Sequence, residues 1–111
     1  MPKRRELTNK GRVALIRSLA GNPAVVRPTK RASKDMVRLG LTKADVCEAV
    51  CTYIDCGSPV METITDTAHG HLGEPAYEVY PTIHAEDRFV KVAIDQYPSG
   101  PVLILVSVHE R

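Results

Sequence analysis

The side chains best suited to acid–base chemistry lie in the second half of the chain. Tyr77, Glu78 and Tyr80 fall within four residues of one another, and Lys91 stands two residues after Phe89. Alternate residues of a β-strand point to the same face, so Glu78 and Tyr80 should share a face while Tyr77 takes the other. Phenol and amine side chains on neighbouring strands can hold an anion.

His109 is the histidine that falls at the end of a predicted strand, the run 102–109. At that place a side chain can reach both solvent and a substrate. The ordinary pKa of an imidazole is about 6.5, so this group can accept and return a proton near neutral pH. We therefore treat His109 as a candidate general acid or base. The alternative is an exposed histidine without a role.

A second polar group surrounds a His-Gly-His sequence. Imidazole and carboxylate ligands suit zinc or manganese, and alternate residues of an extended chain point the same way. The chain has no paired Cys-x-x-Cys, no His-Glu-x-x-His and no phosphate-binding glycine loop. We expect a polar loop here and no bound metal. The residues concerned are Glu62, Asp66, His69, His71 and Glu74.

The three cysteines give no disulfide framework. Cys47 and Cys51 are four residues apart in a predicted helix, a spacing that suits packing, and Cys56 follows alone. We expect buried free thiols.

Charge is divided unevenly along the chain, although its net value is only +2. The part through Lys43 has 12 basic and two acidic residues, and the remainder has three basic and 11 acidic residues. This split predicts a basic face able to hold phosphates, with Arg31, Lys34 and Arg38 on one helix. The alternative is a solvated helical surface.

A length of 111 residues fits one domain. Hydrophobic residues make up 43% and charged residues 25%, which excludes a disordered chain. No run approaches the roughly 18 apolar residues of a membrane span, and no apolar signal segment follows the basic N-terminus. We expect a single domain over residues 1–111 in the cytoplasm, with residues 1–7 as a basic tail.

The first half of the chain has the apolar spacing of three helices. Thr8 and Thr29 are the expected caps of the first two, and Thr42 forms a capping box with Asp45 at the third. Glycine-containing segments end all three helices. The second helix should bury four apolar residues: Ala32, Met36, Val37 and Leu39.

From about residue 60 the apolar period changes to two. The run 102–106 is apolar at every position, which favours an interior strand. Residues 24–27 are expected to form a short edge strand or an extended link. Helices followed by hairpin-connected strands indicate an α+β fold, with N-terminal helices packed on an antiparallel sheet of four or more strands. The predicted strands are 60–65, 76–82, 88–94 and 102–109, separated by turns at 68–75, 85–87 and 97–101.

A series of short segments follows the order of a known family along nearly the whole chain. In the helical half these are Lys3-Arg4 with Thr8, Ala20-Gly21, Thr29 with Ala32, and Leu39-Gly40-Leu41. In the strands, Glu78-Val79-Tyr80 matches Asp-Val-Tyr, Phe89-Val90-Lys91 matches Tyr-Leu-Lys or Tyr-Ile-Lys, and Ser107-Val108-His109 matches Ser-Phe-Lys. In these segments the chain resembles the MqsR family of bacterial toxins.

The resemblance implies a RelE-like fold and the toxin of a type II toxin–antitoxin system. Such toxins are ribosome-independent endoribonucleases that cut messenger RNA at short GC-containing sites and need neither metal nor cofactor. The RNA 2′-hydroxyl attacks its own phosphate, so the protein must take one proton, supply another and stabilise the phosphorane. The implied partner is a cognate antitoxin of zinc-finger and helix-turn-helix type.

The chain departs from the family at its catalytic positions. Glu62 and His109 stand where the family has lysines, Tyr77 where it has glutamine, and Phe89 where it has tyrosine. Glu62 and His109 are then expected to form an acid/base pair. We expect His109, Glu62, Tyr77 and Lys91 to be catalytic, and Tyr80, Arg88, Arg31, Lys34 and Arg38 to bind RNA. The alternative is a non-catalytic module that binds nucleic acid or a regulatory partner.

Overall fold

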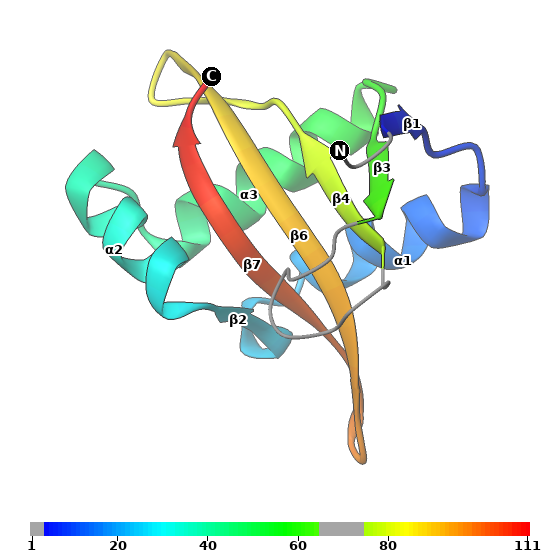
Figure 1. The fold of residues 1–111 in the computed structure, drawn as a ribbon. Helices are drawn as coiled ribbons and strands as arrows, with labels where there is room; N and C mark the ends of the chain where they lie inside the picture. The colour runs from blue at the N-terminus through cyan, green and yellow to red at the C-terminus, as the bar shows by residue number, and fades with distance from the viewer. Residues whose placement is uncertain (1–3, 65–74) are drawn as a thin grey trace.

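The computed structural model describes residues 4–64 and 75–111, which form an α+β fold of helices packed on a mixed sheet (Figure 1). The helices are α1 (Lys10–Ala20), α2 (Lys30–Leu39) and α3 (Lys43–Asp55), with a short 3-10 helix, η1 (Pro23–Val25). The strands are β1 (Arg4–Glu6), β2 (Val26–Pro28), β3 (Met61–Ile64), β4 (Pro75–Val79), β5 (Thr82–Ile83), β6 (Glu86–Tyr97) and β7 (Gly100–Glu110). The expected turn at 68–75 lies almost entirely outside the described residues.

Two of the three predicted helix caps are confirmed. The Thr29 hydroxyl accepts from the Ala32 N–H at 3.1 Å, and Thr42 and Asp45 form the reciprocal capping box. The prediction of Thr8 for α1 is wrong by one residue: the Asn9 side chain accepts from the Arg12 N–H at 3.0 Å. Asparagine caps a helix at least as well as threonine, so the helix starts one residue later.

The sheet has the strand order β1-β3-β4-β6-β7-β2, and β5 pairs with β6 off this path. β7 lies between β6 and β2, which confirms the predicted interior strand. β2 runs parallel to β7, so the sheet is mixed rather than wholly antiparallel. The expected basic tail is partly a strand, because β1 pairs antiparallel with β3.

The hydrophobic core lies between the sheet and the helices, with α1 and α3 on the same side of the sheet (Figure 1). α2 packs beside β7 and buries Ala32 and Met36. Val37 was expected in the core, but its side chain is 82% exposed. Each helical residue is rotated by about 100° from the one before it, so Val37 points away when Met36 faces the core.

A β-bulge in β7 decides which face its last residues take. Lys91 pairs with Ser107 but Val92 pairs with Leu105, so Val106 is the extra residue. Leu105 faces the core, and the bulge turns Ser107 and the residue two beyond it to the other face. Thr29, the cap of α2, donates its hydroxyl to the Val106 carbonyl at 2.9 Å.

All three cysteines are free. Cys47 is buried as expected, and burial raises the pKa of its thiol to about 11, which makes it a poor nucleophile. Cys51 is half-buried, and Cys56 is exposed, contrary to expectation, because it lies just beyond the end of α3. None of the helices in the described ranges is long and apolar enough to cross a membrane.

Candidate functional site

The sheet face opposite α1 and α3 gathers most of the chemically useful side chains. Strand pairing places Glu78 beside Lys91 and Lys91 beside Ser107, and Phe89 beside His109. Strand alternation puts these residues on one face. We call this surface the Lys91 face and define it by six residues: Arg4, Glu78, Tyr80, Phe89, Lys91 and His109.

Glu78 is the buried anion of the Lys91 face, with 1% of its surface exposed. The Arg4 Nε donates to its Oε1 at 2.7 Å, and the Tyr80 hydroxyl donates to the same oxygen at 3.2 Å. A buried carboxylate needs this kind of pairing, because its removal from water is costly. Glu78 therefore fixes the positions of a cation and a phenol.

Lys91 is the cation directly across from Glu78. Burial lowers the pKa of its ammonium group, the positive charges of Arg4 and Arg31 lower it further, and the Glu78 carboxylate opposes these effects. Lys91 thus gives up a proton more readily than an exposed lysine. It can serve as a cation or as an acid.

His109 reaches the Lys91 face because of the bulge at Val106. Its ring stacks on Phe89 with centroids 4.5 Å apart and planes at 12°. Its Nδ1 lies 2.9 Å from the Glu110 carbonyl oxygen, which can only accept a hydrogen bond. In the neutral imidazole Nδ1 therefore carries the proton, and Nε2 is left with the lone pair of a base.

Tyr80 extends the site toward the C-terminal residue. Its ring lies 5.8 Å from that of Phe89, and the Arg111 guanidinium lies 4.5 Å above it. Burial raises the pKa of the Tyr80 phenol, and the charge and hydrogen bond of Glu78 raise it further. Tyr80 therefore stays a hydrogen-bond donor at neutral pH.

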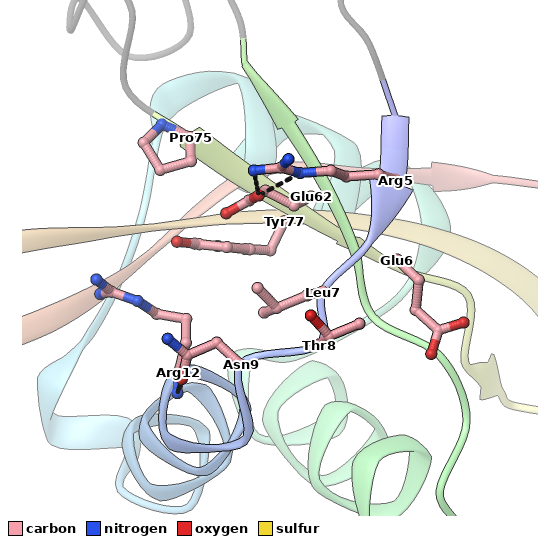
Figure 2. Close-up of a pocket in the computed structure, with 9 residues that line it drawn as sticks. All are labelled: Arg5, Glu6, Leu7, Thr8, Asn9, Arg12, Glu62, Pro75 and Tyr77. Atoms are coloured by element: carbon pink, nitrogen blue, oxygen red, sulfur yellow. Dashed lines mark hydrogen bonds and ion pairs between the residues drawn. The ribbon is translucent and has the colours of Figure 1, made fainter.

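Two of the four expected catalytic residues lie elsewhere. Glu62 pairs with Tyr77 in the sheet, and Tyr77 faces the core side while its neighbour Glu78 faces the other. Glu62 and Tyr77 line a cavity of about 540 Å³ with Arg5 and the start of α1 (Figure 2). The expected pairing of Glu62 with His109 is wrong, because the sheet separates them.

The expected RNA-binding residues differ in exposure and in pairing. Arg31 and Lys34 are exposed on α2. Arg38 forms two hydrogen bonds of 3.1 Å with Glu110, so its charge is partly compensated. Arg88 is only 8% exposed and shares the core-facing side with Val90, so it does not lie on the Lys91 face.

Sequence reasoning did not assign roles to Arg4, Glu78 or Arg111. The sequence did show that Glu78 shares a strand face with Tyr80, and this pattern could have indicated that Glu78 belongs to the site. Arg4 gave no signal, since it stood in an apparently unstructured tail. Within the described ranges no group of three or more possible metal ligands comes together. The candidate ligands Asp66, His69, His71 and Glu74 lie outside those ranges.

No protein-family model, curated protein or solved structure matches the chain.

Proposed function

We propose that the protein is a metal-independent endoribonuclease with a RelE-like fold, the toxin of a type II toxin–antitoxin system that cleaves messenger RNA in the cytoplasm. The observation that carries the proposal is the Lys91 face itself. A base, a cation with a lowered pKa and a buried carboxylate share one face of a rigid sheet. The resemblance to MqsR toxins supports the same reaction.

His109 is assigned as the general base. Its Nε2 takes the proton of a ribose 2′-hydroxyl, and the 2′-oxygen forms a bond to the adjacent phosphorus. Stacking on Phe89 and the Nδ1 hydrogen bond hold the ring in one orientation. A base fixed in this way needs little reorganisation in the transition state.

Lys91 is assigned as the cation and the acid. It lies diagonally from His109 across β6 and β7, a relationship that usually separates Cα atoms by roughly 7–8 Å. One phosphate can bridge that gap. Lys91 stabilises the phosphorane and gives a proton to the 5′-oxygen as the phosphorus–oxygen bond breaks. The products are a 2′,3′-cyclic phosphate and a 5′-hydroxyl.

The bound RNA chain would continue past α2, which flanks the Lys91 face. Arg31 is close enough to influence the Lys91 ammonium, and Lys34 is exposed one turn further on. Both side chains can contact phosphates on either side of the scissile one. A cognate antitoxin would inhibit the enzyme by covering the Lys91 face or this helix.

A non-catalytic module that binds RNA or a partner is the second candidate. The exposed Val37 beside Lys34 and Arg38 favours it, because an apolar side chain among cations suits an amphipathic, acidic partner. The two functions predict different fates for a bound transcript: cleavage in one case, intact retention in the other.

The test is product analysis of an end-labelled messenger RNA incubated with the purified protein in a metal chelator. The proposal predicts fragments with 2′,3′-cyclic phosphate and 5′-hydroxyl ends. An intact transcript that is retained on the protein supports the binding module instead. Cleavage that stops in the chelator contradicts the metal-independent mechanism.

A further inference from the structure

The cavity lined by Glu62 and Tyr77 lies on the side of the sheet away from the Lys91 face. It has a volume of about 540 Å³ and opens between β1, β3, β4 and the start of α1 (Figure 2). Its size is in the range of small-molecule sites. Its main polar lining comes from Arg5, Asn9, Arg12, Glu62 and Tyr77, with Pro75 at one side.

Tyr77 is a buried side chain that lines this cavity. Its side chain is 2% exposed, lines the cavity, and its hydroxyl lies on the side of Arg12 and Pro75 in Figure 2. No hydrogen bond joins this hydroxyl to another residue in the described part of the chain, and it is not among the fully buried polar atoms there that lack a partner. Burial raises the pKa of the phenol, the nearby charge of Arg12 opposes the rise and that of Glu62 adds to it, so Tyr77 keeps its proton at neutral pH. The hydroxyl is therefore available to donate to a ligand in the cavity.

Arg12 supplies an uncompensated positive charge. No ion pair joins it to another residue in the described ranges, whereas Arg5 is held by Glu62 with Nη2 to Oε1 at 3.0 Å. Asn9 uses its side-chain oxygen to cap α1, which leaves its amide N–H groups as donors. The positive end of the α1 dipole lies at the same place. Glu6 also lines the cavity, but its carboxylate points away from Tyr77 in Figure 2.

We propose that this cavity binds a phosphate monoester, with the phosphate held by the Arg12 guanidinium, the Tyr77 hydroxyl and the Asn9 amide. A planar guanidinium binds two phosphate oxygens at once, and a phenol and an amide can donate to a third. The cavity is larger than one phosphate, so it has room for the group that the phosphate carries. The same chemistry is presented by inorganic phosphate, by a free mononucleotide and by the 5′-phosphate of an RNA end.

Isothermal titration calorimetry with inorganic phosphate, adenosine 5′-monophosphate and a trinucleotide with or without a 5′-phosphate tests the proposal. Binding of the mononucleotide assigns a small ligand, and binding of the phosphorylated trinucleotide alone assigns an RNA end. Arg12→Gln should weaken binding about tenfold, because a charge-assisted hydrogen bond is lost. Tyr77→Phe, which keeps the ring, should weaken it about threefold or more.

Lys10→Gln is the matched control, because Lys10 is an exposed cation beside the cavity that does not line it. Its affinity should stay within about twofold of wild type. His109→Gln should also bind normally, which separates this site from the proposed ribonuclease. The proposal is wrong if none of the four ligands binds or if Arg12→Gln keeps wild-type affinity. It is also wrong if adenosine, titrated as a control without phosphate, binds as tightly as adenosine 5′-monophosphate.

Discussion

Glu78 and Lys91 face each other across β4 and β6, and the carboxylate is almost wholly buried while the ammonium has a lowered pKa. Arg4 and Tyr80 share the same carboxylate oxygen. The carboxylate forms an ion pair with Arg4, and its charge opposes the loss of the Lys91 proton. The pair is therefore the structural centre of the Lys91 face.

Glu78→Gln should destabilise the fold by about 1–3 kcal/mol, because Arg4 loses its buried ionic partner. Glu62→Gln is the matched control: it removes the same charge from a carboxylate that forms an ion pair with an exposed arginine, Arg5. Urea unfolding should show a loss of less than about 1 kcal/mol for the control. Equal losses in the two variants would show that the burial of Glu78 has no special role.

Lys91 should give the stability a recognisable pH dependence. Its pKa is lowered in the folded protein from an ordinary value of 10.5, so above the folded value the unfolded chain binds more protons than the folded one. The free energy of unfolding of wild type relative to Lys91→Met should then rise with pH through this window. Urea unfolding of both proteins from pH 8 to 11 measures the difference. A flat or falling difference would contradict the lowered pKa of Lys91 in the folded protein.

Thr29 joins α2 to the bulge that orients His109. Thr29→Val removes the cap bond to Ala32 and the bond to the Val106 carbonyl, and should cost about 1–2 kcal/mol. Thr29→Ser keeps the hydroxyl and should stay close to wild type in thermal unfolding. If valine and serine behave alike, the hydroxyl does not anchor the bulge.

RNA affinity should depend on Arg31 and Lys34 more than on Arg38, whose charge Glu110 already compensates. Each lost phosphate contact should reduce the slope of log affinity against log salt by about one. Fluorescence anisotropy with Arg31→Gln, Lys34→Gln and Arg38→Gln over a salt series gives the slopes. Salt-independent binding in wild type would remove α2 from the proposed RNA path.

Much of the fold follows from local sequence patterns. The caps at Thr29 and Thr42 and the opposite faces of Tyr77 and Glu78 were predictable, because each depends on neighbouring residues. The unbroken apolar run 102–106 was a sufficient signal for the interior position of β7. The strand at Arg4 was not, since three exposed residues show no alternation and gain their order from pairing with β3.

The candidate site was harder to predict because strand faces depend on register. One extra residue at Val106 reverses the faces of everything after it in β7, and a bulge leaves no clear mark on the sequence. The separation of Glu62 from His109 likewise follows from pairing across distant strands. The RelE-like assignment and the proposed reaction are still predictions.

The claim that RNA is cleaved on the Lys91 face is tested most directly by the initial cleavage rate of His109→Gln beside that of Glu62→Gln. Both side chains were candidates for one acid/base pair, yet they lie on opposite faces of the sheet. With both folds confirmed by circular dichroism, His109→Gln should lose on the order of a hundredfold in rate, the usual size of an acid/base contribution. Glu62→Gln should cleave within about threefold of wild type. Wild-type cleavage by His109→Gln, or a comparable loss in Glu62→Gln, would contradict the account.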